Sequence, residues 1–342
     1  MCVAALAWPA IACAGTVDVV GTTLTYTATL GESNNLTVYN GPAGQIRITE
    51  NNPGGVVTPA GVCTTITADT ANCPSAGVTD FNIDLSDLDD SVEVTVTPAL
   101  PGTILGGVGN DYLISGPGNE TLDGGPGEDR IGYVDATGPA VIDLGGGTGS
   151  ATGAGNDLLN GFEDVFGSGF GDTVTGDAGP NLISTFAGGD NIEGGDGSDI
   201  IQSGDNDDTV QGGPGNDQLN GELGDDFVDG EADDDTIVAS DGSDTLAGVN
   251  GTDTVDYSAQ PGALVLDLVG GTASKPGGTD VLERFEVVIA SSFDDRIIVR
   301  DGAPESITCG LGADAVDADI SDTPNLDCET IAPIATGPPT LS

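Results

Sequence analysis

The chain has 342 residues, of which 56 are acidic and 6 are basic, and it contains no histidine. Its formal net charge of −50 argues against nucleic acid and anionic membranes as partners, because like charges repel. The lack of histidine excludes an HExxH metalloprotease and a Ser-His-Asp hydrolase. With 56 glycines and only 4% aromatic residues, a conventional core of large side chains is not expected.

Residues 2–14 form an apolar run that ends in Ala12-Cys13-Ala14, directly before Gly15. This pattern is typical of the hydrophobic and cleavage regions of a secretory signal, so residues 1–14 are predicted to be a truncated signal peptide. A lipid-modified Cys13 is the weaker alternative. The run is too short to span a bilayer, and no membrane span is expected elsewhere.

Residues 15–98 are predicted to form an N-terminal β domain or cap. Apolar and polar residues alternate there with the two-residue period of half-buried strands. The alternation fits either a small sandwich or irregular coils that cap a solenoid, whose open end would expose apolar side chains and unpaired strand edges. The predicted strands are residues 23–30, 35–40, 45–50, 78–87 and 91–97.

Two arrays of nine-residue units follow. The first, in residues 99–132, reads GGVGNDYLI, SGPGNETLD and GGPGEDRIG from residue 106 onward. The main array, residues 167–256, holds ten units without an insertion. Its sixth position is Asp in nine units, with Asn181 as the exception, and its eighth position is aliphatic in all ten.

Each position of the unit predicts a piece of local structure. A Gly-rich hexamer followed by one inward aliphatic residue predicts a tight turn that leads into a very short strand. Two units would make one flattened coil of eighteen residues, and stacked coils would bury a ladder of Val, Ile and Leu. In the last nine units of the main array the fourth position is Gly in seven and otherwise Asn206 or Asp233, so it is predicted to have a positive φ. The alternative, an acidic disordered spacer, has no reason to keep hydrophobic residues in phase.

The pattern GGxGxDxUx, which begins in full at residues 106, 124, 194 and 212, resembles the RTX, or hemolysin-type, calcium-binding repeat. The resemblance implies an all-β fold, a parallel β-roll or β-solenoid, and several bound Ca²⁺ ions. In that family, turns two units apart lie above one another, and backbone carbonyls and sixth-position carboxylates bind Ca²⁺ between them. Oxygen ligands of this kind are those that calcium prefers.

The resemblance predicts calcium ligands in both arrays. They are Gly106, Gly109, Asp111, Gly118, Glu120, Gly124, Gly127, Asp129, Asp172, Asp190, Gly194, Gly197, Asp199, Asp208, Gly212, Gly215, Asp217, Gly224, Asp226, Asp235, Gly242, Asp244, Gly251, Asp253 and Asp295.

The chain leaves the nine-residue frame twice in the same way, at residues 133–166 and 257–299. Each segment is predicted to be a longer rung, and together they indicate an internal duplication. A ligand-binding protrusion and a wider structural coil filled by a tyrosine both fit. We favour the coil, because an aromatic residue at fixed spacing usually packs. The matched residues are Tyr133 and Tyr257, Asp143 and Asp267, and Asp172 and Asp295.

Residues 300–331 contain one imperfect repeat, with Asp314 at its sixth position, and are predicted to form a C-terminal cap. The Pro-rich residues 332–342 are predicted to be a flexible tail. Four cysteines remain after the signal segment, and of their three possible pairings we favour two local ones. An even number of cysteines fits oxidising, extracellular conditions. The favoured disulfides are Cys63–Cys73 and Cys309–Cys328.

No catalytic motif is found, and the few basic residues are scattered along the chain, so the protein is not expected to be an enzyme. The chain resembles secreted bacterial RTX proteins and is predicted to fold into a rigid β-roll when it binds Ca²⁺. A structural or adhesive role at the cell surface is favoured, with a surface or polysaccharide partner. The alternatives are a non-catalytic module of an RTX exoenzyme or toxin system and, less favoured, a Ca²⁺-dependent polysaccharide-active enzyme.

Overall fold

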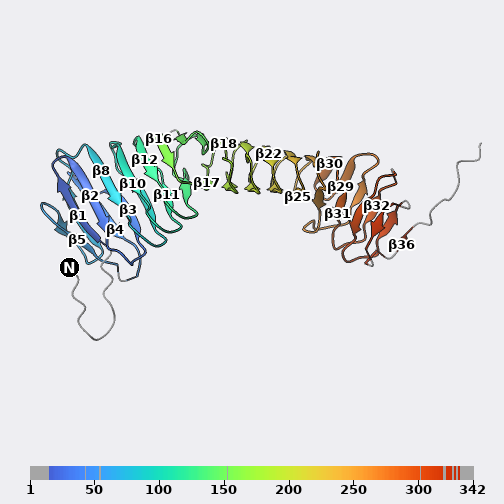
Figure 1. The fold of residues 1–342 in the computed structure, drawn as a ribbon, viewed down its shortest axis with the longest axis horizontal. Helices are drawn as coiled ribbons and strands as arrows, with labels where there is room; N and C mark the ends of the chain where they lie inside the picture. Colours follow the sequence, from blue (N-terminus) through green and yellow to red (C-terminus); the bar gives the residue numbers. More distant parts are fainter. Residues whose placement is uncertain are drawn as a thin grey trace, which may run out of the picture. The chain divides into compact units, whose positions relative to one another are not determined.

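The structure, a computed structural model, describes residues 15–331 except 43, 54, 152, 301, 319, 320, 326 and 329. The predicted signal peptide and C-terminal tail lie outside the described residues. The described chain is built from β-strands and turns, and it includes no apolar helix long enough to cross a membrane. It divides into two compact units, residues 1–175 and 176–342 (Figure 1). The prediction of an all-β parallel roll is confirmed.

The first unit begins with stacked coils that continue into the first array. Strand β8 pairs in parallel with β2 and with β10, while β9 pairs in parallel with β3 and β11. Residues 15–98 therefore form coils of the solenoid rather than a separate sandwich. The strands of these coils are β1 (Gly15–Val20), β2 (Thr23–Ala28), β3 (Asn35–Asn40), β8 (Asp80–Asp84), β9 (Ser91–Thr95), β10 (Gly102–Leu105), β11 (Tyr112–Ile114), β12 (Glu120–Asp123), β13 (Arg130–Gly132) and β17 (Asp164–Phe166).

Antiparallel strands flank the first coils. Strand β4 pairs with β3 and with β7, and β7 pairs with β6, all antiparallel, so an edge of the stack is extended by paired backbone. The predicted disulfide Cys63–Cys73 is present and ties β7 to the segment before β6. These strands are β4 (Gln45–Glu50), β6 (Thr64–Thr65) and β7 (Thr70–Pro74), whereas β5 (Val57–Pro59) pairs in parallel with β1.

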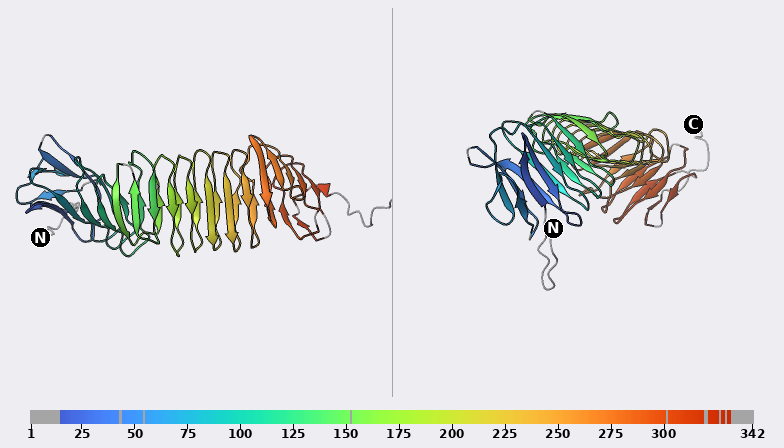
Figure 2. Two further views of the ribbon diagram at one scale, coloured as in Figure 1. Left: turned by 90° about the horizontal axis from the view of Figure 1, so that it is seen from above. Right: turned by 60° about the vertical axis from the view of Figure 1, so that its left-hand side comes forward.

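The second unit contains two parallel sheets with an eighteen-residue offset between neighbouring strands. In one sheet Ile183 pairs with Ile201 and Ile201 with Leu219, and in the other Ile192 pairs with Val210. Two nine-residue units thus make one coil, as predicted (Figure 2). The sheets contain β19 (Leu182–Ser184), β21 (Ile200–Gln202), β23 (Gln218–Asn220), β25 (Thr236–Val238) and β27 (Thr254–Asp256), and β20 (Asn191–Glu193), β22 (Thr209–Pro214), β24 (Phe227–Ala232) and β26 (Thr245–Ala247).

The core is a ladder of the eighth-position side chains. Each of these, from Ile183 to Val255, is at most 1% exposed. One inward aliphatic side chain per strand is enough, because the coil above and the coil below cover it. Burial of such a side chain contributes about 1.5–3 kcal/mol, which explains how a chain with few aromatic residues forms a stable core.

Positive φ angles occur at two positions of the nine-residue unit, and only those at the fourth position were predicted. The fourth position has a positive φ in most units, including Asn206 at 81° and Asp233 at 77°, although Gly179 and Gly251 do not. The second position also has a positive φ in most units, including Glu222 at 66° and Val249 at 79°, although Asp177 and Ser240 do not. This position escaped sequence reasoning because its residue types show no preference for glycine. Stacking between coils imposes the conformation there.

Each longer rung inserts an antiparallel hairpin into a parallel sheet. Strand β16 pairs with β12, β15 with β16, β14 with β15, and β14 with β18. The second copy repeats this order through β26, β30, β29, β28 and β32. The strands are β14 (Ala140–Asp143), β15 (Thr148–Ala151), β16 (Gly155–Asn160) and β18 (Thr173–Thr175), and β28 (Val265–Asp267), β29 (Thr272–Lys275), β30 (Gly278–Glu283) and β32 (Arg296–Ile298).

The tyrosines of the longer rungs are part of the core. Tyr133 and Tyr257 are 0% exposed, which agrees with a coil filled by an aromatic side chain. Two-residue alternation in these rungs predicts that Ile142 and Leu144, like Leu266 and Leu268, lie on an inward strand face. Ile142 and Leu266 are buried as predicted, but the prediction is wrong for Leu144 and Leu268, which are half-buried beyond the ends of β14 and β28.

The end of the second unit continues the two sheets. Strand β33 pairs with β31 and β35, and β34 pairs with β32 and β36, all in parallel. The second predicted disulfide, Cys309–Cys328, is present here. The strands are β31 (Val287–Ile289), β33 (Ser306–Thr308), β34 (Ala315–Asp317), β35 (Thr323–Pro324) and β36 (Thr330–Ile331).

The core ladder predicts the effect of a truncation. Leu219→Ala should lower the free energy of unfolding by about 2–5 kcal/mol, because the cavity lies between two coils that cannot collapse independently. Leu223→Ala is the matched control, since Leu223 lies in the following turn and is 50% exposed. The measurement is urea unfolding in calcium, and equal effects of the two substitutions would contradict the ladder.

Candidate metal centre

The sixth-position carboxylates form a ladder along each edge of the stack. The backbone N–H of Asp199 donates to Oδ1 of Asp217 at 2.8 Å, and that of Asp217 donates to Oδ1 of Asp235 at 2.9 Å. On the other edge Asp190 donates to Asp208 in the same way at 2.8 Å. Each carboxylate therefore holds the backbone of the coil before it, which fixes the register between coils. We call these rows the sixth-position ladders.

A second ladder runs beside them in the opposite direction. The N–H of Asp225 donates to Oδ1 of Asp207 at 3.0 Å, and the N–H of Ser243 donates to Oδ1 of Asp225 at 2.8 Å. Here the fifth-position side chain holds the coil that follows it. This ladder lies in exposed turns. Sequence reasoning did not reveal it, because the fifth position varies in residue type, with Asp, Asn, Ser and Thr among those present.

The sixth-position carboxylates use only part of their hydrogen-bonding capacity. Their side chains are almost fully buried, and in most of them the second oxygen, Oδ2, accepts no hydrogen bond. A buried acceptor without a partner costs about 1–3 kcal/mol, and a charged one costs more. The carboxylates in this state are Asp111, Asp129, Asp199, Asp217, Asp226, Asp235 and Asp253.

These oxygens face carbonyl oxygens of the neighbouring turn. A methyl group added to Gly194 would lie 2.5 Å from both Asp199 Oδ2 and the carbonyl oxygen of Gly212, one coil later. At Gly212 the same test finds Asp217 Oδ2 and the carbonyl oxygen of Gly230. The first-position glycine thus leaves space in which a carboxylate and a carbonyl of two coils converge. An oxygen-only ligand set in a space without a side chain fits Ca²⁺.

Burial raises the pKa of the ladder carboxyl groups, with repulsion between neighbouring carboxylates as a further cause. The pKa is about 6 for Asp199 and Asp217, about 7 for Asp226 and about 8 for Asp235. The ionised ladder is therefore unfavourable without a cation. A bound cation would offset both the burial and the repulsion.

Three predicted ligands have partners for both carboxylate oxygens. Ser168 donates through its N–H and its hydroxyl to Asp172, and Ser291 does the same for Asp295. The second oxygen of Asp244 accepts a hydrogen bond from Lys275 at 2.9 Å. Their environments differ from that of Asp217, whose second oxygen has no partner.

Glu120 occupies a sixth position with a longer side chain. It is 2% exposed, and its N–H donates to Asp157 Oδ1 at 2.8 Å. Burial, together with the nearby charge of Asp157, raises the pKa of Glu120 to about 9.

Sequence reasoning missed the ladder residues that the longer rungs supply. Asp157 and Asp280 accept from the N–H groups of Glu120 and Asp244, and Glu163 and Glu286 accept from those of Asp129 and Asp253. The internal duplication could have revealed these residues, since each of them has a matching acid in the other copy. Both Asp157 and Asp280 also follow a Gly by two residues, as in a regular unit.

A cluster of carboxylates around one point is not how this structure gathers metal ligands. Among the described residues, the only three candidate side chains with ligand atoms within 4.8 Å of one another are Cys309, Asp327 and Cys328. Two of these sulfurs form a disulfide, so this group is no metal site. A calcium ion in the arrays would instead bind carboxylates together with turn carbonyls.

A family model agrees with this geometry. The RTX calcium-binding nonapeptide repeat matches the chain in four copies, at residues 102–131, 166–201, 202–237 and 229–260. The chain therefore contains RTX calcium-binding nonapeptide repeats. No match was found among curated proteins. In this RTX protein the sixth-position carboxylates and first-position carbonyls would hold Ca²⁺, which supplies the positive charge that the buried ladders lack.

The raised pKa values predict how acid affects the metal-free protein. The unfolded pKa of Asp is about 3.9, so between about pH 4 and pH 8 the folded state binds more protons than the unfolded state. Stability without metal should therefore rise as the pH falls through this window. Urea unfolding in a chelator at pH 8 and at pH 5 checks this, and a higher midpoint at pH 8 would contradict it.

A conservative substitution separates the two roles of a ladder carboxylate. Asp217→Asn keeps an oxygen that accepts the N–H of Asp199 but removes the charge. The variant should fold at least as well as the wild type in a chelator, yet need several-fold more Ca²⁺ to reach full stability. Asp217→Ala removes both the accepting oxygen and the charge, so this variant should be less stable in a chelator and should also need more Ca²⁺.

The matched control is Asp267→Asn. Asp267 lies at the end of β28 and accepts a local hydrogen bond from the N–H of Gly270 at 2.8 Å. Its substitution should leave the calcium midpoint unchanged in a titration followed by circular dichroism. Equal midpoints for the variants at 217 and 267 would reject Asp217 as a calcium ligand.

Proposed function

We propose that this RTX protein is an extracellular, non-catalytic solenoid that folds on binding calcium and acts as a structural or adhesive component of the cell surface. The observation that carries the proposal is the row of buried carboxylate oxygens without partners, such as those of Asp217 and Asp235. Without a cation these oxygens oppose the stacking that the aliphatic core favours.

The mechanism couples folding to calcium binding. In a low-calcium cytosol, the net charge of −50 and the ionised ladders keep the repeats expanded by self-repulsion. Outside the cell, calcium at about 10⁻³ M, within the affinity range of extracellular modules, fills the turns and lets the coils stack. The two disulfides support an extracellular location, because such bonds persist under oxidising conditions.

A surface role is supported by the regularity of the fold. Every coil repeats the same turns, so the stack presents long rows of exposed acidic groups, among them Asp207 and Asp225. Calcium bridges between such rows and acidic polysaccharides would provide adhesion, and the coupled folding would provide stiffness.

The first test is far-UV circular dichroism in a chelator and then with about 10 mM Ca²⁺. A change from coil to β-structure is expected with Ca²⁺ and not with Na⁺ at the same ionic strength.

The outcomes distinguish the parts of the proposal. A β spectrum in the chelator would show that packing alone folds the protein, and the calcium mechanism would then be withdrawn. The surface role is checked by retention of the folded protein on an immobilised acidic polysaccharide. Retention in calcium, but not in magnesium at equal concentration, is expected. Equal retention in both would reject calcium-bridged adhesion.

A further inference from the structure

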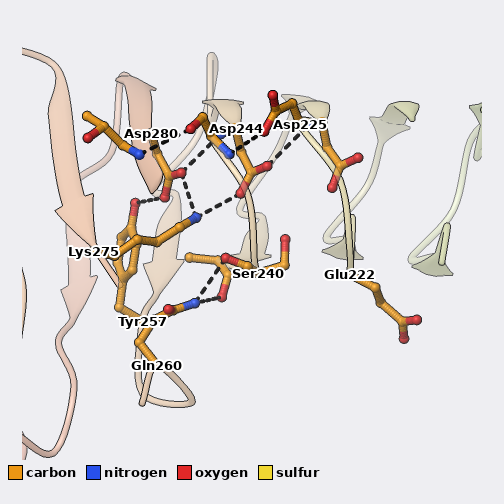
Figure 3. Close-up of polar contacts among 12 residues, drawn as sticks. Glu222, Asp225, Ser240, Asp244, Tyr257, Gln260, Lys275 and Asp280 are labelled. Carbon is orange, nitrogen blue, oxygen red and sulfur yellow. Dashed lines mark hydrogen bonds and ion pairs between the residues drawn. The ribbon is translucent and has the colours of Figure 1, made fainter. Parts of the chain in front are cut away.

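The second longer rung inserts a cation into one sixth-position ladder. Lys275 Nζ lies 2.9 Å from Asp244 Oδ2 and 2.6 Å from Asp280 Oδ1, and all three side chains are 0% exposed (Figure 3). Asp244 and Asp280 are consecutive members of the ladder, since the N–H of Asp244 donates to Asp280 at 3.0 Å. The ammonium group therefore lies between two carboxylates of neighbouring turns.

The same rung also occupies carbonyl oxygens of that turn. Gln260 Nε2 donates to the carbonyl oxygens of Ala239 at 2.9 Å and of Ser240 at 3.0 Å (Figure 3). These are the first two residues of the unit that contains Asp244. At this turn, a carboxylate oxygen and two carbonyl oxygens thus already have donors from within the chain.

Neighbouring turns lack such donors. The second carboxylate oxygens of Asp226 and Asp235, in the preceding coils, accept no hydrogen bond. Asp244 keeps the regular contact of the ladder, because its Oδ1 accepts the N–H of Asp226, and its second oxygen has the lysine as a partner. Lys275 therefore supplies a donor to the second carboxylate oxygen of Asp244, and the corresponding oxygens of Asp226 and Asp235 lack such a donor.

The first longer rung provides an internal comparison. Its tyrosine and acid make the same contact, with Tyr133 donating to Asp157 at 2.9 Å and Tyr257 donating to Asp280 at 2.8 Å. Ala136 stands in the place of Gln260, since the N–H of each donates to the carbonyl of its rung's tyrosine. Ala151, the last residue of β15, pairs with the first residue of β16. In the same way Lys275, the last residue of β29, pairs with the first residue of β30.

The two copies therefore differ in their donors. Alanine offers neither an ammonium group nor an amide, and among the described residues no basic side chain pairs with Glu120 or Asp157. The carboxyl pair of the second copy has the ammonium group of Lys275 between its members.

We propose that Lys275, assisted by Gln260, is a built-in cation that takes the place of Ca²⁺ at the turn of residues 239–244. This inference rests on the proposed calcium-driven folding and replaces the prediction that Asp244 is a calcium ligand. It makes the junction between the main array and the second longer rung independent of calcium. That junction is then a fixed point on which the calcium-dependent coils can stack.

The experiment counts the bound calcium ions at saturation by equilibrium dialysis of the full chain. Lys275→Met removes the ammonium group but keeps an unbranched side chain, so the variant should bind one more Ca²⁺ than the wild type. Asp244→Asn combined with Lys275→Met leaves one carboxylate in the pair and should return the number to that of the wild type. Arg296→Met is the charge-matched control, because Arg296 is exposed, and it should leave the number unchanged.

Hydrogen exchange of β26 and β30 gives a second readout. At calcium concentrations too low to fold the main array, these strands should be protected in the wild type and unprotected in Lys275→Met, and saturating Ca²⁺ should restore their protection. Equal calcium numbers for wild type and Lys275→Met, or a variant that no calcium concentration folds, would overturn the lysine proposal alone. A wild type that binds no calcium would overturn the proposed function as well.

Discussion

The structure depends on one hydrogen bond, from the backbone N–H at the sixth position to the carboxylate one coil later. In the second unit it recurs along both edges, for example from Asp199 to Asp217 and from Asp190 to Asp208. The bond requires a short acidic side chain that bends back over its own turn. It also places a negative charge in a nearly buried position, where the second oxygen finds no donor. The interaction that sets the register is thus the one that makes the fold need a cation.

Burial of the aliphatic core and repulsion within the acidic ladders oppose each other in every coil. A single aliphatic residue per strand builds the core, so the favourable term is modest for each coil and grows by repetition. The acidic ladders repeat with the same period, so the unfavourable term grows equally. Under the proposed mechanism, the number of turns that acquire a positive partner decides whether the coils stack.

The duplicated rungs show that the partner can vary. The hydroxyl and amide of a serine serve Asp172 and Asp295, a lysine serves Asp244, and the pair Glu120–Asp157 has no basic partner. All these solutions occur where an inserted hairpin or its re-entry point changes the turn. Where the first position is glycine, as at Gly212, that glycine lies directly against the carboxylate and leaves no room for such a side chain.

Periodicity alone determined the all-β class, the eighteen-residue coil, the aliphatic ladder and the acidic residues of the arrays, because each depends on local residue types that recur in phase. The local disulfides were also predicted from spacing. The tertiary structure alone showed that residues 15–98 are coils of the stack, that Glu222 is left-handed, and that Asp280 joins the ladder. It also brought Lys275 to Asp244, 31 residues away in the chain. These features arise from contacts between coils or across an inserted hairpin. Such contacts do not recur at a fixed spacing in the chain, so the residue pattern does not reveal them.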